Sequence, residues 1–161
     1  MLKKILLSCL ILVSNSTFSK SLALSFDDGL DLVTHPQAQH INDAILNTLK
    51  QNKVHAIIYP SLSKIGANDG LGMIKQWGEQ GHRIGNHGNL HLNLNKDEVN
   101  LSTYLADMQQ GHQAFSTLQG FVPRYRFPFL KEGNTLEKRD GVRQWIKDYH
   151  YQSGAVSIDA S

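Results

Sequence analysis

The sequence predicts one α/β domain built on a parallel sheet or barrel. Short apolar segments of strand length alternate with longer segments that carry the apolar spacing of amphipathic helices, and no internal repeat interrupts this alternation. The chain has 161 residues, 40% of them hydrophobic, which suits one domain with its own core. Sixteen basic and 14 acidic residues give a formal net charge of +2, so the basic excess of a nucleic-acid-binding protein is missing and we predict no nucleic-acid partner.

The first strand is predicted at residues 21–26, where apolar and small side chains alternate. Leu24 and Phe26 then lie on one face of the strand, and Ser25 and Asp27 lie on the other. In a barrel, the face with the small side chains points inward. We therefore expect Asp27 at the C-terminal end of the strand, at the mouth of the barrel.

The remaining elements follow from apolar periodicity and from residues that end strands and helices. Pro60 ends one predicted strand and Gly81 ends one predicted helix. Helices are predicted at residues 39–50, 71–80, 97–118 and 141–149, and further strands at residues 54–59, 82–85, 125–127 and 155–158.

The N-terminal segment has the pattern of a signal peptide, predicted at residues 1–19. Lys3 and Lys4 precede an apolar stretch at residues 5–13, which is too short to span a bilayer as a mature helix. An uncleaved anchor and a lipoprotein modified at Cys9 are the alternatives. With the signal peptide we expect a secreted or periplasmic protein without stable membrane insertion after cleavage. Cys9 is the only cysteine, so the mature domain has no disulfide and no cysteine-ligated zinc.

The first candidate site is the pair of carboxylates in Asp27-Asp28-Gly29, at the end of the first strand. Adjacent side chains at a strand end point in different directions, so one carboxylate can bind a cation while the other transfers a proton. Gly29 allows a sharp turn beside them. The alternative is an ordinary polar turn.

The second candidate site is the histidine pair His87 and His91, which follows a short predicted strand. On a helical turn, residues four apart lie on one face and can share a metal ion. Asn86 stands directly before the pair and can cap the turn. Two unrelated histidines are the alternative.

The third candidate site is Arg126 in the segment Arg126-Phe127-Pro128-Phe129. An arginine at a strand end, followed by a rigid proline, places a fixed cation at the mouth of the barrel. Its guanidinium can hold a carboxylate through a bidentate pair. The alternative is a surface arginine before the end of a strand.

The order of these three segments resembles the polysaccharide deacetylase family of carbohydrate esterases, whose domain is called the NodB-homology domain. The resemblance extends over residues 22–158. It implies an incomplete, distorted (β/α) barrel of the NodB-homology type at residues 20–161, which lacks its C-terminal strands. It also implies a hydrolase that removes acetyl groups from an N-acetylated or O-acetylated polysaccharide.

The resemblance also implies roles for the site residues. Asp28, His87 and His91 are expected to bind one divalent metal ion, most often zinc, and a metal-bound water is expected to be the nucleophile. Asp27 is expected to act as the general base, with Arg126 orienting it and keeping it ionised.

Two departures from the family pattern affect the expected activity. Gly88 stands where the family usually has Ser or Thr, so a hydroxyl that would steady the histidine segment is missing. The family also has a late Leu-x-His segment that supplies the general acid. His150 is the only histidine after Arg126, and its neighbours do not fit that segment. A catalytically inactive glycan-binding remnant of the same fold is therefore the main competing interpretation.

The same residues also allow two further functions. An esterase that acts on O-acetyl or aryl esters would use the same centre, and a structural protein with chance histidines would bind no metal. Tyr59, Trp77 and Tyr104 are candidates either for stacking on sugars or for the core.

Overall fold

The computed structural model describes residues 22–159, so the predicted signal peptide at residues 1–19 lies outside the described residues. Five parallel strands form one sheet in the order β1-β2-β3-β4-β5. The strands are β1 (Leu24–Asp28), β2 (Ala56–Pro60), β3 (Arg83–Asn86), β4 (Phe121–Tyr125) and β5 (Gln152–Ser153). The helices are α1 (Ala38–Gln51), α2 (Leu71–Glu79), α3 (Leu101–Phe115) and α4 (Leu136–Asp148), with 3-10 turns η1 (Ala67–Gly70) and η2 (Pro128–Leu130).

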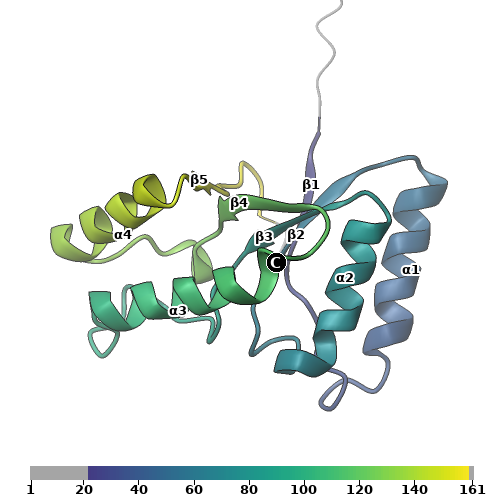
Figure 1. The fold of residues 1–161 in the computed structure, drawn as a ribbon, viewed down its shortest axis with the longest axis horizontal. Coiled ribbons are helices and arrows are strands. Elements are labelled where there is room, and N and C mark those ends of the chain that lie inside the picture. The colour runs from purple at the N-terminus through teal and green to yellow at the C-terminus, as the bar shows by residue number, and fades with distance from the viewer. Residues whose placement is uncertain (1–21, 160–161) are drawn as a thin grey trace, which may run out of the picture.

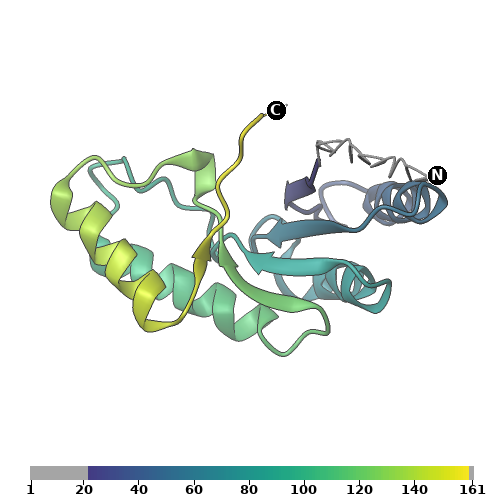
Figure 2. The same cartoon turned by 90° about the horizontal axis from the view of Figure 1, so that it is seen from above.

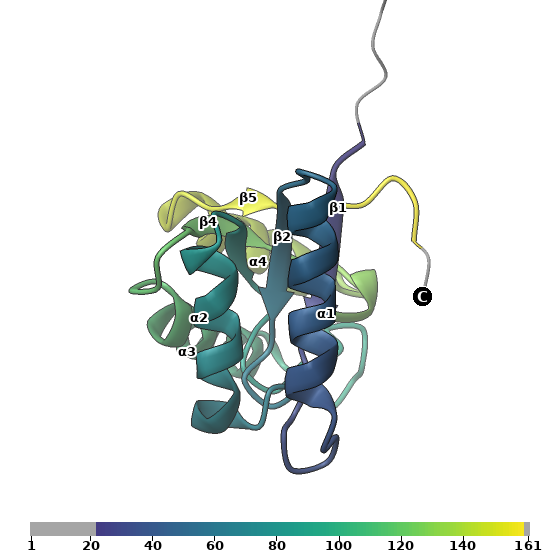
Figure 3. The ribbon, with the colours of Figure 1, turned by 90° about the vertical axis from the view of Figure 1, so that its right-hand side faces the viewer.

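The four helices lie along one side of the curved sheet. Figure 1 shows α1 and α2 beside the first strands and α3 and α4 beside the last ones, and Figure 2 shows the four helices as an arc seen from above. Figure 3 shows α1 in front of the sheet at β1 and β2, with α2 beside it toward β4. In the described part of the chain β1 and β5 are the two edges of the sheet and do not pair with each other. The predicted incomplete, distorted (β/α) barrel is confirmed.

The two faces of β1 are those that the alternation predicts. Phe26 points toward the helices, where its ring packs edge-on against Trp77 with 5.2 Å between the centroids. Ser25 and Asp27 point the other way, and both accept hydrogen bonds from Arg126. The inward face of the strand thus carries the polar residues of the candidate site.

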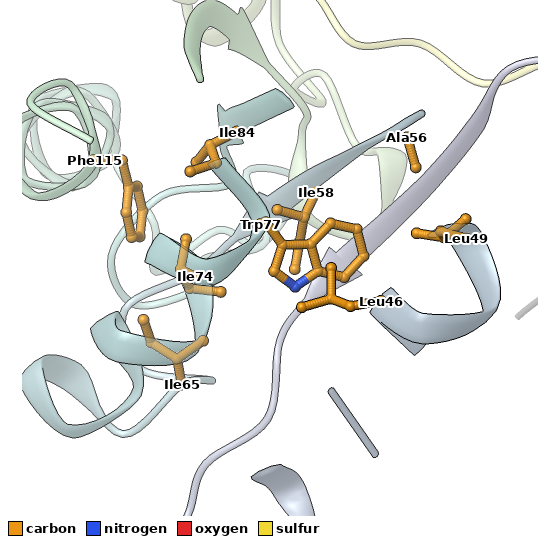
Figure 4. Close-up of a cluster of buried hydrophobic side chains, with 9 residues drawn as sticks. All are labelled: Leu46, Leu49, Ala56, Ile58, Ile65, Ile74, Trp77, Ile84 and Phe115. Carbon is orange, nitrogen blue, oxygen red and sulfur yellow. The ribbon is translucent and has the colours of Figure 1, made fainter. Parts of the chain in front are cut away.

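Two hydrophobic clusters hold the helices on the sheet. The first joins α1 and α2 to β2 and β3, and Figure 4 shows its side chains gathered around Trp77. The second packs α3 and α4 on β4 and is rich in aromatic residues. Each large side chain that is fully buried contributes about 1.5–3 kcal/mol to folding. The second cluster contains Leu94, Val99, Tyr104, Met108, Tyr125, Phe127, Val142, Trp145 and Tyr151.

Capping residues set the starts of the last two helices. The helix predicted from residue 97 begins at Leu101, because the Asn100 side chain accepts a hydrogen bond from the Thr103 amide. The helix predicted from residue 141 begins five residues earlier, at Leu136. It follows Thr135, whose hydroxyl accepts a hydrogen bond from the Lys138 amide. The glycine at position 141 lies inside α4, where a Cβ would come within 2.3 Å of Leu101.

Two strand predictions near the C-terminal end are wrong in position. The strand predicted at residues 125–127 is β4, which ends at Tyr125 and contains Pro123. The strand predicted at residues 155–158 does not form, and the two-residue strand β5 at Gln152–Ser153 pairs with β4 instead. No helix in the described residues is long and apolar enough to cross a membrane.

Candidate metal centre and active site

The three expected metal ligands come together at the C-terminal ends of β1 and β3. Asp28, His87 and His91 each offer one ligand atom, and these atoms all lie within 4.8 Å of one another. Zinc bonds nitrogen and oxygen ligands at about 2.0–2.2 Å, so small side-chain movements suffice for all three to reach one ion. The geometry therefore fits a shared cation.

The turn after β1 separates the two adjacent carboxylates. Asp28 has a left-handed backbone with φ of 68°, and its carbonyl accepts a hydrogen bond from the Ser61 amide at 3.1 Å. Gly29 follows with φ of 86°, and a Cβ there would lie 2.4 Å from Ile65. This turn directs Asp28 toward the histidines, while Asp27 faces Arg126.

The segment that carries the histidines is an irregular loop, so the expectation of a helical turn is wrong. It begins after β3, with Gly88 at φ of 84° and His91 at φ of 56°. Asn86 does stabilise the turn as expected, because its side-chain oxygen accepts from the Gly88 amide at 2.8 Å. The two imidazoles lie edge to face, with 4.9 Å between their centroids.

The tautomer of His87 follows from its hydrogen bond. Its Nδ1 lies 2.7 Å from the carbonyl oxygen of Arg126, and a carbonyl only accepts, so Nδ1 carries the proton. Nε2 then presents a lone pair toward Asp28, whose Oδ1 lies 3.7 Å away. Two acceptors that face each other repel unless a cation lies between them. Burial lowers the pKa of His87, which keeps the imidazole neutral and able to bind a metal.

Asp28 supplies a second observation that fits a cation. Its Oδ1 is buried and lies 3.1 Å from Nε2 of His91, and beyond the two imidazoles no hydrogen-bond donor of the described part of the chain reaches it. Burial raises the pKa of Asp28, but the interaction with His91, with smaller contributions from His87 and Lys64, brings it below its usual value. A buried, ionised oxygen that faces two imidazole nitrogens is an expected ligand for a metal ion.

Arg126 connects the other carboxylate to the barrel interior. Its Nη1 donates to Asp27 Oδ1 at 2.5 Å and to the Ser25 hydroxyl at 2.9 Å. Its Nε donates to the Gly154 carbonyl at 2.7 Å, and its guanidinium lies 4.1 Å from the centroid of the Tyr59 ring. One guanidinium nitrogen thus holds Asp27, so the contact is not the bidentate pair that the sequence suggested.

The aromatic side chains that were candidates for stacking on sugars lie in the interior. Tyr59, Trp77 and Tyr104 are each at most 2% exposed. The exposed aromatic residue at the site is Phe129, which is 55% exposed and packs on the His91 ring with 4.6 Å between centroids. Position 150 lies in the turn after α4 and is exposed.

Sequence reasoning missed one group that touches the histidine segment. Asp107, on α3, is 3% exposed and accepts hydrogen bonds from the amides of Asn89 and Leu90. The sequence signal was a carboxylate within the predicted helix at residues 97–118, on a side that packs inward. Such a buried group needs hydrogen-bond donors, so it indicates a polar contact. Its partners follow only from the packing of α3 against β3.

Comparison with known proteins finds relatives of similar sequence. A peptidoglycan-N-acetylglucosamine deacetylase of Bacillus cereus is 31% identical over 138 residues, which are 85% of this chain and 44% of that protein. A chitin deacetylase of Colletotrichum lindemuthianum is 30% identical over 112 residues, which are 67% of this chain and 41% of that protein. The chain therefore spans less than half the length of these relatives.

Solved structures show the same fold. A crystal structure of a peptidoglycan N-acetylglucosamine deacetylase matches with a TM-score of 0.63 at 26% identity, covering 81% of this chain and 54% of that chain. The family model described as polysaccharide deacetylase matches residues 14–151, a range that includes both carboxylates, both histidines and the arginine of the site. The chain belongs to the polysaccharide deacetylase family.

Proposed function

We propose that the chain is a metal-dependent hydrolase that removes acetyl groups from an N-acetylated or O-acetylated polysaccharide. The observation that carries this proposal is the convergence of Asp28, His87 and His91 beside a second carboxylate, Asp27, that Arg126 holds. Hydrolysis of an acetamide requires a site for a cation and a carboxylate that is not a metal ligand, and this arrangement provides both.

The substrate class rests on the relatives. Their names describe deacetylation of peptidoglycan N-acetylglucosamine and of chitin. An acetylated glycan is therefore the proposed partner, and a secreted or periplasmic location agrees with the predicted signal peptide at residues 1–19.

The ligand set favours a divalent ion of the zinc type. Asp28 Oδ1 and Nε2 of both histidines would hold it, and imidazole with carboxylate is a common zinc set. When bound, such an ion supplies Lewis-acid chemistry, because it lowers the pKa of a coordinated water and polarises a carbonyl oxygen. The hydrogen bond from His87 Nδ1 to the Arg126 carbonyl orients one ligand for that ion.

Asp27 is the proposed general base. Its carboxylate is 38% exposed, so a water molecule can reach it, and Oδ1 is held by Arg126. The second oxygen remains available to accept a proton from the attacking water. Arg126 is 5% exposed and positions Asp27 relative to the metal ligands.

The test measures acetate release from N-acetylated glycan oligomers and from aryl acetates by the zinc-loaded protein. We expect Asp27→Asn to lower the rate by about 100- to 10,000-fold while zinc affinity stays near that of the wild type. Asp28→Ala should lose both activity and zinc. Asp43→Asn, which removes an exposed carboxylate on α1, is the matched control and should change neither.

Different results would favour a different function. Zinc binding and glycan retention without acetate release would support the inactive glycan-binding protein, and activity confined to aryl acetates would support the esterase. A wild-type protein that binds no divalent metal would contradict the proposed function.

A further inference from the structure

The loop that carries the two histidines is held from behind by one buried carboxylate. We call residues 87–91 the histidine loop. Asp107 reaches it from α3, where Oδ2 accepts from the Asn89 amide at 3.0 Å and Oδ1 accepts from the Leu90 amide at 2.6 Å. Asp107 is 3% exposed, and no cationic side chain of residues 22–159 forms an ion pair with it. Burial raises the pKa of Asp107, and the hydrogen bonds from the amides of Leu90 and Asn89 oppose this rise, so the loop favours the charged carboxylate.

The backbone amides at the start of the histidine loop all have acceptors. The His87 amide donates to the Pro60 carbonyl at 3.1 Å, and the Gly88 amide donates to the Asn86 side chain at 2.8 Å. The next two amides are the ones that Asp107 binds. The carbonyls of Gly88 and Asn89 accept from the amides of Leu62 and Ser63, so backbone bonds to residues 60–63 hold one side of the loop and side-chain acceptors hold the amides that remain.

Two glycines allow α3 to come this close. A Cβ at Gly88 would lie 2.4 Å from Asp107 Oδ2, and a Cβ at Gly111 would lie 2.3 Å from Asn86 Oδ1. Asp107 and Gly111 are four residues apart on α3, so they lie on the same face of the helix. The carboxylate therefore occupies the space into which any side chain at position 88 would project.

We propose that Asp107 is a positioning residue, whose carboxylate fixes the histidine loop from α3 and so sets the spacing of His87 and His91 for the metal. The proposal rests on the proposed function for the identity of the bound ion. It also accounts for Gly88, because the steadying group comes from α3 and a hydroxyl-bearing side chain at position 88 would collide with it. Asp107 itself touches no ligand atom and takes no part in proton transfer.

The first test is metal affinity, measured by titration with Co²⁺ and its visible absorption. We expect Asp107→Asn to weaken Co²⁺ binding by about 10- to 100-fold and to alter the absorption bands, since substitution of groups that orient metal ligands has effects of this size. Val142→Ala, in the buried core of α4, is the matched control. It should lower the thermal midpoint and leave Co²⁺ affinity unchanged. Wild-type affinity and spectrum in Asp107→Asn would overturn the proposal.

The second test needs no metal. In the metal-free protein, hydrogen exchange at the amides of Asn89 and Leu90 should be at least about tenfold faster in Asp107→Asn and unchanged in Val142→Ala. Equal exchange in Asp107→Asn and wild type would overturn the positioning role whether or not the protein binds metal. A wild type that fails to bind Co²⁺ would instead overturn the proposed function, so the two failures are distinguishable.

The third test uses a double-mutant cycle at positions 88 and 107. Gly88→Ala should reduce Co²⁺ affinity through both backbone strain and collision with the carboxylate, and only the strain persists in an Asp107→Ala background. We therefore expect a smaller fold-loss from Gly88→Ala in that background than in the wild type. Equal losses in both backgrounds would contradict the inference that a side chain at position 88 competes with the Asp107 carboxylate for the same space.

Discussion

The two halves of the sheet are packed by different chemistry. The cluster between α1, α2 and the first three strands consists mainly of aliphatic side chains around Trp77 (Figure 4). The cluster under α3 and α4 contains Tyr104, Tyr125 and Tyr151, and the buried polar residues Asn86 and Asp107 lie at its border with the histidine loop.

This difference follows the needs of the two parts of the site. Asp27 and Asp28 end a regular strand, so β1 pairing with β2 fixes their backbone, and apolar packing behind it is sufficient. The histidine loop shares backbone hydrogen bonds with residues 60–63 on one side, and on its other side the amides of Asn89 and Leu90 find their acceptors in a side chain of α3. A buried polar cluster is thus found where irregular backbone must be held in one conformation.

The largest expected effect concerns the half of the sheet that is packed by α1 and α2, which we call the aliphatic half. Trp77→Ala should lower the free energy of unfolding by about 3–5 kcal/mol, because the ring is 1% exposed and its removal leaves a cavity. Urea denaturation of the metal-free protein measures this change. Zinc affinity of the remaining folded protein should stay near that of the wild type. A large loss of affinity would show that the two halves are not separate.

A second substitution tests the segment after the histidine loop. Lys138 is 9% exposed, and its ammonium donates to the carbonyls of Leu94 and Lys96 at 3.2 and 2.8 Å. Lys138→Met should lower the free energy of unfolding by about 1–3 kcal/mol, because it leaves buried acceptors unpaired. Lys147→Met, in the last turn of the same helix, is the control, and equal losses in both variants would contradict this assignment.

The tyrosine pair gives a smaller effect with a distinctive pattern. The Tyr125 hydroxyl donates to the Tyr104 hydroxyl at 2.9 Å, and both side chains are fully buried. Tyr125→Phe and Tyr104→Phe should each cost about 1 kcal/mol of unfolding free energy, and the double variant should cost less than their sum. Chemical denaturation measures the cycle, and simple additivity would show that the hydroxyls act independently.

The smallest effect is a pH dependence in the aliphatic half. Burial lowers the pKa of His82 below its ordinary 6.5, with a smaller contribution from His55. As the pH falls below 6.5, the unfolded chain binds a proton at His82 more readily than the folded protein does, so the free energy of unfolding decreases. The thermal midpoint of the metal-free protein should fall between about pH 7 and about pH 5, and it should fall less in His82→Gln. His87 shifts in the same direction, so part of the dependence should persist in that variant.

Sequence reasoning placed the residues of the candidate site better than the elements that support them. The alternation in β1 predicted the face on which Asp27 lies, because a strand puts every second residue on one face. The resemblance to the family predicted that Asp28, His87 and His91 lie together. The strand before Arg126 was misplaced because Pro123 lies inside it, and a proline in a strand is tolerated only at special positions.

Long-range packing explains the remaining differences. Nothing local indicates that Gly141 lies within α4, because the reason is the contact with Leu101 on another helix. In the same way, the bonds from Asp107 to the histidine loop join residues 17 and 18 positions apart. Apolar periodicity identifies the buried face of a helix or strand, and capping residues identify helix starts. Neither identifies the partner of a buried polar group.

The contacts of Arg126 also constrain the order in which the protein assembles. They draw on Ser25 from β1, Tyr59 from β2 and the carbonyl of Gly154 after β5, and the first of these lies 101 positions away in the chain. Contacts of such separation form late in folding, because the intervening chain must first become ordered. A nascent chain released before residue 154 would therefore carry both carboxylates and both histidines. It would still lack the Gly154 carbonyl, which orients the Arg126 guanidinium.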